Sequence, residues 1–267
     1  PLFKPEAVLA HTRTLFSGTV TRALLVTPKQ GEADNAALRQ AMLAPVVADG
    51  SVRLAAKPVR FDELPPTGAP GKITSLAPTG LLGIEKVEFA NGVKALMWST
   101  PDEPGRMTVK VRFGGGYRSF GPKDAAYIAL GDGGLVGSGQ GTLGQEEIDR
   151  IRTGRKIGYD FKIEDTNFQF SAATRDADLA DQLYLFAAKF AQPRWDANPV
   201  LRAKAAARLQ YDAFAASPQG VLERDFKFLQ RDRDPRFRTP GPAEMEKATP
   251  DGFRQVWSRA LASGPIE

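Results

Sequence analysis

The chain contains no cysteine and a single histidine, His11, which limits how a polypeptide of its length can be held together. Disulfide bonds, thiolate catalysis and cysteine-based zinc sites are excluded by composition alone. One histidine also cannot supply the two or more nitrogen or thiolate ligands that a catalytic zinc ion needs beside a carboxylate. The fold must therefore rest on a packed apolar core. With 42% hydrophobic and 25% charged residues in 267 positions, the composition allows one.

The net charge of +5 is mild, and most basic residues are interspersed with acidic ones. Basic side chains gather only in Arg231–Asp234 and at Arg236 and Arg238. A nucleic-acid groove would interleave such residues with aromatic side chains on one face. We interpret the cluster as a solvated loop and expect no nucleic-acid binding. No run of about eighteen apolar residues occurs, so we expect no membrane-spanning helix.

The sequence divides into three blocks. Residues 1–44 predict a helix, a strand over 19–26 and a second helix, a set that cannot bury its own faces. We expect this block to be the C-terminal remnant of a preceding domain. Residues 45–83 are rich in proline and glycine with little periodicity, which predicts an interdomain linker. Residues 84–267 carry regular patterns and are expected to form a domain. Both termini look cut, and we interpret the chain as an excised fragment.

The patterns of the third block predict an α+β fold. Asn91–Gly92 lies between two alternating apolar runs, which is the strongest local signal for a β-hairpin. Later in the block, apolar residues recur at helical spacing. The predicted strands are 85–89, 93–98, 107–113, 156–163 and 166–174, and the predicted helices are 124–130, 145–151, 199–216 and 218–230, with further helices starting at 176 and 249. This order predicts a two-layer α/β sandwich, with helices on one face of a mostly antiparallel sheet.

The glycine-dense segment 131–144 contains two patterns associated with nucleotides. Residues 139–144 match G-x-G-x-x-G, but the dinucleotide fingerprint requires this pattern directly after a strand and at the start of a helix. Residues 134–140 fail the P-loop pattern, because Gln140 stands where a lysine is needed. We therefore expect no nucleotide binding and interpret 134–140 as a flexible loop, with a substrate-facing loop as the alternative.

Several short phrases of the third block carry a resemblance to a known protein family. They are Val87–Val93, Val111–Gly116, Gly133–Leu135, Gly154–Lys156 and Phe253–Trp257, followed by Gly264–Glu267. With the predicted element order, these phrases resemble the pitrilysin/insulysin (insulinase) family of zinc metallopeptidases over nearly the whole chain. The resemblance is to the inactive second half of bacterial single-chain members. It implies the fold shared by mitochondrial processing peptidase and related metallohydrolases.

Active members of that family carry H-x-x-E-H on the helix after the third strand, where the histidines bind zinc and the glutamate activates water. Here that helix corresponds to Asp124–Asp132, which contains no histidine and no glutamate. The resemblance therefore implies no catalytic residue, no metal ligand and no cofactor in this chain. Zinc is expected in an active domain of the parent protein, which is expected to be a zinc-dependent metalloendopeptidase. We interpret the carboxylates of Glu164 and Asp165 as turn residues.

In this family, an inactive half closes against an active half around a chamber that holds unfolded peptide. The resemblance implies that the chain forms the chamber wall opposite an active H-x-x-E-H domain, supplied by the same polypeptide or by a partner subunit. Tyr117 and Arg118, directly after a triple glycine, are the candidate substrate-facing residues, with a polar strand end as the alternative. A second hypothesis is a non-enzymatic assembly subunit, because some relatives are structural subunits of a respiratory complex. The resemblance favours a periplasmic or cell-envelope location.

Overall fold

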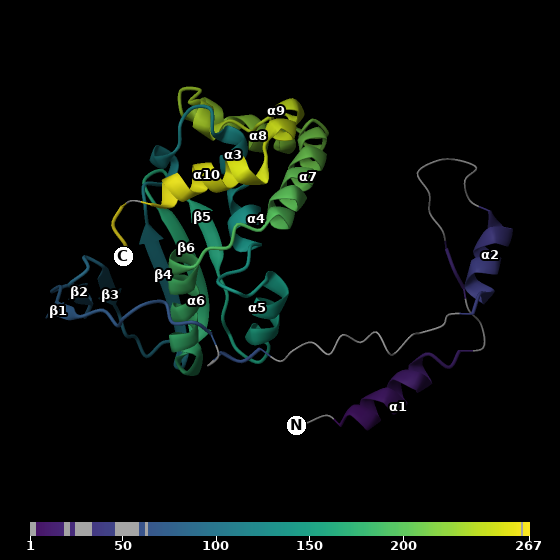
Figure 1. Ribbon diagram of the computed structural model, residues 1–267, viewed down its shortest axis with the longest axis horizontal. Helices are drawn as coiled ribbons and strands as arrows, with labels where there is room; N and C mark the ends of the chain where they lie inside the picture. Colours follow the sequence, from purple (N-terminus) through teal and green to yellow (C-terminus); the bar gives the residue numbers. More distant parts are fainter. Residues whose placement is uncertain (1–3, 19–21, 25–33, 46–58, 62–63, 263) are drawn as a thin grey trace. The chain divides into compact units, whose positions relative to one another are not determined.

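The computed structural model describes residues 4–18, 22–24, 34–45, 59–61, 64–262 and 264–267. The chain divides into two compact units, Pro1–Lys57 and Pro58–Glu267, which are described separately below (Figure 1). The larger unit carries both β-sheets and the candidate functional residues. Among the described residues, no helix combines the length and the apolar character needed to cross a bilayer.

The smaller unit contains two helices, α1 (Pro5–Leu15) and α2 (Asn35–Leu43). A proline opens α1, where its missing N–H leaves no helical hydrogen bond unmade. Asp34 caps α2 by accepting a hydrogen bond from the backbone N–H of Ala36 at 2.8 Å. Neither helix has a buried residue among those described. The strand predicted over 19–26 lies mostly outside the described residues.

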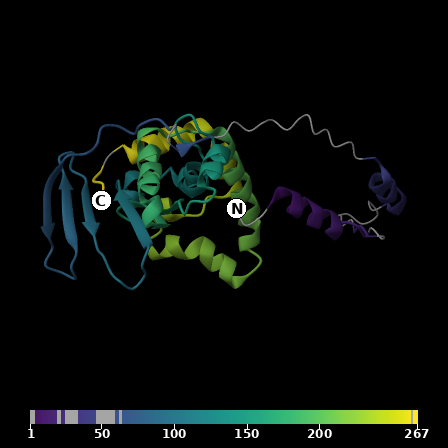
Figure 2. The same cartoon turned by 90° about the horizontal axis from the view of Figure 1, so that it is seen from below.

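The larger unit begins with a three-stranded antiparallel sheet in the order β1–β2–β3, which lies beside the helical body in Figure 2. β2 (Glu85–Phe89) and β3 (Lys94–Met97) form the hairpin predicted around Asn91–Gly92. β1 (Ile73–Pro78) pairs with the other edge of β2 and lies within the range 45–83, predicted as a linker. Its side chains are mostly exposed, so no apolar alternation marks it in the sequence, and pairing with β2 holds it in place.

Three further strands form a second antiparallel sheet in the order β4–β6–β5, so the strands make two sheets and not one. They are β4 (Arg106–Phe113), β5 (Asp160–Ile163) and β6 (Phe168–Arg175). In β6, Phe168 and Phe170 are buried, whereas the alternate residues Gln169 and Ser171 are only partly buried. One face of the sheet is therefore apolar. Helices pack on this face, which confirms the predicted α+β class.

Aromatic side chains fill the space between this sheet and the helices. Phe170 stacks on Phe186 with ring centroids 5.8 Å apart, and Phe168 lies 5.5 Å from the fully buried Trp257.

The helices are α3 (Ala125–Ala129), α4 (Gly131–Val136), α5 (Gln145–Arg152), α6 (Leu179–Ala191), α7 (Ala197–Phe214), α8 (Pro218–Gln230), α9 (Pro242–Lys247) and α10 (Pro250–Leu261), with the 3₁₀ turns η3 (Gly116–Ser119), η4 (Asp176–Asp178) and η5 (Pro235–Phe237).

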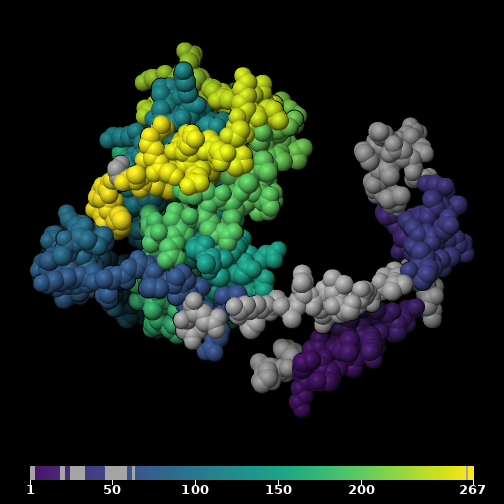
Figure 3. Space-filling model, in the orientation of Figure 1, coloured from purple at the N-terminus to yellow at the C-terminus, as the bar shows by residue number. Residues whose placement is uncertain are grey.

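The chain before β1 is attached to α6. The ring of Phe61 meets that of Tyr184 edge-on, with centroids 5.4 Å apart. The Tyr184 hydroxyl donates a hydrogen bond to the carbonyl oxygen of Pro65 at 2.7 Å. The stretch between this point and β1 runs over the surface of the larger unit (Figure 3).

The last two residues pair with both sheets. The backbone N–H of Lys94 in β3 donates to the carbonyl oxygen of Ile266 at 3.1 Å. In β4, Arg112 exchanges two backbone hydrogen bonds with Glu267, each 2.8 Å long. Ile266 also packs against the core. A two-residue stretch therefore lies along the free edges of β3 and β4.

Candidate substrate-facing surface

The segment Asp124–Asp132, expected to correspond to the metal-binding helix of the peptidases, forms α3 and the start of α4. Leu130 is fully buried, and the carbonyl oxygen of Tyr127 accepts a hydrogen bond from the indole N–H of Trp257 at 2.8 Å. A Cβ atom added to Gly131 would lie 2.3 Å from the Trp257 ring. The indole therefore rests directly on the backbone, and apolar packing fills this position.

The residues at this position do not fit a zinc ion. Tyr127, Leu130 and Gly131 offer neither a nitrogen nor a thiolate ligand, which are the donors that zinc prefers. Elsewhere in the described part of the chain, no three His, Cys, Asp or Glu side chains gather closely enough to hold a metal ion. The described residues therefore support no zinc-dependent step.

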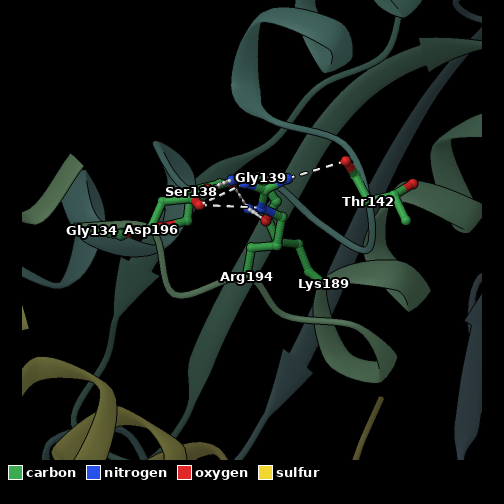
Figure 4. Close-up of polar contacts among 7 residues, drawn as sticks. All are labelled: Gly134, Ser138, Gly139, Thr142, Lys189, Arg194 and Asp196. Carbon is green, nitrogen blue, oxygen red and sulfur yellow. Dashed lines mark hydrogen bonds and ion pairs between the residues drawn. The ribbon is translucent and has the colours of Figure 1, made fainter. Parts of the chain in front are cut away.

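The glycine-dense segment that follows is folded and buried, so the prediction of a flexible loop at 134–140 is wrong. Part of it forms α4, and Ser138 and Gln140 are only 2% and 3% exposed. Lys189 of α6 donates a hydrogen bond to the carbonyl oxygen of Leu135 at 2.8 Å. It also donates to the carbonyl oxygen of Ser138 (Figure 4). A cation at this place satisfies carbonyl groups that the helix end leaves unpaired.

Charged side chains fasten this segment to α6 and to the start of α7. Burial lowers the pKa of Lys189 to about 7, and the negative charge of Asp196 opposes the shift. Asp196 accepts a hydrogen bond from the backbone N–H of Gly139 at 2.9 Å and pairs with Arg194 at 2.9 Å. Arg194 also donates to the carbonyl oxygen of Thr142 at 3.1 Å (Figure 4). The arrangement gives the segment a fixed shape.

The fixed shape of this segment leaves few backbone N–H groups for the phosphates of a nucleotide. Phosphate sites in glycine-rich loops use backbone N–H groups that point at the ligand. The N–H groups of the three residues Gly139–Gly141 already donate to other parts of the chain. The first three N–H groups of the G-x-G-x-x-G match at 139–144 are therefore not free to bind a phosphate.

The predicted substrate-facing residues Tyr117 and Arg118 lie in η3, directly after β4. Gly116 has a φ of 58°, and a Cβ atom there would lie 2.1 Å from the carbonyl oxygen of Glu164. The backbone N–H of Tyr117 donates to the same oxygen at 3.0 Å, so η3 is held against the turn between β5 and β6. Tyr117 is half-buried, whereas Arg118 is exposed.

Two residues from the region of α8 and η5 contact Tyr117, and a third contacts Phe237. The Tyr117 ring stacks on that of Phe237, with centroids 4.2 Å apart and planes 23° from parallel. Lys227 donates a hydrogen bond to the Tyr117 hydroxyl at 2.9 Å, and its Nζ lies 4.2 Å from the ring centroid. The Arg231 guanidinium lies 5.2 Å from the Phe237 ring. We call Tyr117, Arg118, Lys227, Arg231 and Phe237 the aromatic–basic surface.

Ion pairs hold this surface together from both sides. Arg231 pairs with Asp165 at 2.6 Å, which links α8 to the turn between β5 and β6. Arg236 binds both carboxylate oxygens of Asp234 and donates to the carbonyl oxygen of Tyr117 at 3.4 Å. The hydrogen bonds from Arg236 lower the pKa of Asp234. The arginines therefore connect η3, α8 and η5.

The turn between α8 and η5 is strained. Asp232 and Arg233 have φ values of 51° and 59°, in the left-handed region that residues with a Cβ atom rarely adopt. Such residues cost of order 1–3 kcal/mol each and persist where the surroundings fix them. The backbone N–H of Arg233 donates to the carbonyl oxygen of Phe228 at 3.0 Å, which closes the turn. The turn follows directly after Arg231 of the aromatic–basic surface.

Of the aromatic–basic surface, the sequence alone points to Tyr117 and Arg118 and does not point to the other three residues. Lys227 and Phe237 are far from Tyr117 in the sequence, and nothing local predicts that they meet. The cluster around Arg231 was interpreted as a solvated loop, although Arg231 contacts Phe237 and Asp165. One signal was present, because Phe237 is an aromatic residue between two arginines.

No protein-family model matches the chain, and no curated protein matches it. Solved structures match its fold. The periplasmic protease PqqL from Escherichia coli matches with a TM-score of 0.59 at 16% identity, covering 99% of this chain and 26% of PqqL. The ferredoxin protease FusC, solved as a mutant in complex with Arabidopsis ferredoxin, matches with a TM-score of 0.60 at 20% identity, covering 85% of this chain and 25% of FusC. A protease from Helicobacter pylori matches with a TM-score of 0.56 at 16% identity, covering 68% of this chain and 45% of that protease.

The chain thus spans about a quarter of the length of PqqL and of FusC. At these identities the likeness concerns the arrangement of the backbone. The chain has the α+β fold found within these proteases.

Proposed function

We propose that this chain is a non-catalytic domain of a zinc peptidase of the pitrilysin/insulysin type. In this role it forms the wall of a substrate chamber opposite an active H-x-x-E-H domain, which belongs to the same polypeptide or to a partner subunit. The proposal is supported by a fold that is found in proteases, in which the segment expected to match the metal-binding helix packs Tyr127 and Gly131 against Trp257. The parent protein is proposed to be a zinc-dependent metalloendopeptidase of the periplasm or cell envelope, as PqqL is a periplasmic protease.

An exposed apolar stripe on α8 supports contact with another domain. Leu222, Phe226 and Leu229 recur at the spacing of one helix face, and each side chain is about half exposed, at 53%, 51% and 52%. Contiguous apolar surface of this kind is typical of interaction sites. The proposed partner is the active half of the peptidase.

The aromatic–basic surface is the proposed point of contact with unfolded peptide. It joins the partly buried rings of Tyr117 and Phe237 to cations, which suits the mixed apolar and polar character of an unfolded chain. Tyr117 and Arg118 are the residues of this surface that we propose to face the substrate.

Two measurements test the proposal. The purified 267-residue chain is expected to contain no stoichiometric zinc by elemental analysis and to leave fluorogenic peptides uncleaved. Stoichiometric zinc together with proteolysis would overturn the proposal. In extracts of the source organism, affinity purification is expected to recover an H-x-x-E-H domain, on the same polypeptide or a bound one. Recovery of partners without that motif would favour a non-enzymatic assembly subunit instead.

A further inference from the structure

The aromatic–basic surface has more cations than carboxylates to pair with them. Of its three basic side chains, Arg231 pairs with Asp165 at 2.6 Å. Lys227 and Arg118 form no ion pair with any described carboxylate, whereas the adjacent strained turn adds one charge of each sign, Asp232 and Arg233. An exposed excess of positive charge attracts anions and raises their local concentration.

Lys227 is held in a defined position. Its Nζ donates to the Tyr117 hydroxyl at 2.9 Å and lies 4.2 Å from the Tyr117 centroid and 5.3 Å from the Phe237 centroid. An ammonium group has three donors, so two remain for an incoming acceptor. Because these contacts already order the side chain, an anion that binds here costs less rotamer freedom.

The geometry of the rings favours a carboxylate over a nucleic acid. Single-stranded nucleic acids bind to free aromatic faces, on which their bases stack. Here Tyr117 and Phe237 stack on each other, and Lys227 and Arg231 lie over the rings. The faces are therefore already covered. Asp165, bound to Arg231, shows how a carboxylate is received at this surface.

We infer that the aromatic–basic surface binds acidic segments of extended polypeptide, whose Asp and Glu carboxylates meet Lys227, Arg118 and Arg231. The inference rests on the proposed contact with unfolded peptide and names the class of segment that this contact prefers. The preference is electrostatic, at an exposed site, and therefore weakens as salt screens the charges.

Binding of two labelled, unstructured peptides tests the inference. They share one sequence, except that one carries several glutamates where the other carries glutamines. Fluorescence anisotropy with the 267-residue chain is expected to give about tenfold tighter binding of the glutamate peptide at low ionic strength, and most of this difference is lost at about 0.5 M salt. Equal affinities would overturn the acidic preference and leave the proposed chamber-wall role standing. Failure to bind either peptide would remove the peptide contact itself.

Substitutions locate the effect. Lys227→Glu is expected to abolish the difference between the two peptides, whereas Lys72→Glu, the same charge change at an exposed residue just before β1, is expected to preserve it. Circular dichroism and thermal melting check that both variants fold. Tyr117→Phe keeps the ring but removes the acceptor that fixes Lys227, and is expected to reduce the difference in part.

An oligonucleotide that binds more tightly than the glutamate peptide, and depends on Lys227, would reassign the surface and overturn the inference.

Discussion

The indole N–H of Trp257 donates a hydrogen bond to the backbone carbonyl of Tyr127 at 2.8 Å, and so joins α10 to α3 in the interior of the larger unit. The indole also packs against Gly131, so that α3 and the start of α4 are held against α10. The hydrogen bond between Trp257 and Tyr127 is therefore expected to stabilise the fold.

Trp257→Phe is expected to lower the free energy of unfolding by about 2 kcal/mol. The change leaves the buried carbonyl of Tyr127 without its donor and opens space beside Gly131. Urea unfolding measures the effect. The control is Trp98→Phe, at a side chain that is 62% exposed, which is expected to change stability by less than about 0.5 kcal/mol. Equal effects would contradict the structural role of Trp257.

Lys189 is expected to make stability depend on pH. Its pKa is lowered from the ordinary 10.5 to about 7 in the folded state, so between these values the unfolded chain binds more protons. The contribution of Lys189 to the free energy of unfolding therefore rises as pH increases from about 7 towards 10.5. It is lost again as pH falls through the pKa of the folded state.

Urea unfolding of the wild type and Lys189→Met at several pH values between about 7 and 9 measures this contribution. The wild type is expected to gain stability relative to the variant as pH rises. Lys110→Met, at an exposed lysine of β4, is expected to retain the wild-type slope. Parallel curves for the wild type and Lys189→Met would refute the assignment.

Tyr184→Phe is expected to loosen the segment before β1. The ring and its contact with Phe61 remain, but the hydrogen bond to Pro65 is lost. We expect stability to fall by about 1 kcal/mol, and trypsin to cleave after Arg60 faster in native buffer. Unchanged cleavage would show that the hydroxyl does not hold this segment.

Tyr159→Phe provides the opposite case. The buried Tyr159 hydroxyl has no hydrogen-bond partner within the described residues, and burial raises its pKa well above the ordinary value. Removing a buried hydroxyl without a partner is expected to leave the free energy of unfolding unchanged or raise it by up to about 1 kcal/mol. A loss comparable with that of Tyr184→Phe would mean that the Tyr159 hydroxyl is satisfied after all.

Local sequence signals predicted those elements whose ends are defined by neighbouring residues. The β2–β3 hairpin follows from Asn91–Gly92, which supplies the turn. Helix α8 spans the predicted range because Ser217 accepts a hydrogen bond from Gly220 ahead of a helical pattern. Thr249 caps α10 in the same way.

Elements held by distant partners could not be predicted in this way. β1 depends on pairing with β2. The glycine-dense segment is held by Lys189, which the local sequence shows only as a basic residue in the last turn of α6. At the candidate site, Tyr117 could be named from its place after a strand. Its contact with Phe237 depends on how α8 and η5 return to the sheet.

The pairing of Ile266 and Glu267 has a mechanical consequence. Their backbone hydrogen bonds reach Lys94 in β3 and Arg112 in β4, so the same two residues are attached to both sheets. A pull on this end of the chain therefore loads both strand edges together, along the direction in which paired strands slide past each other. Tension from one side of the molecule would be divided between two sheets that otherwise form separate ladders.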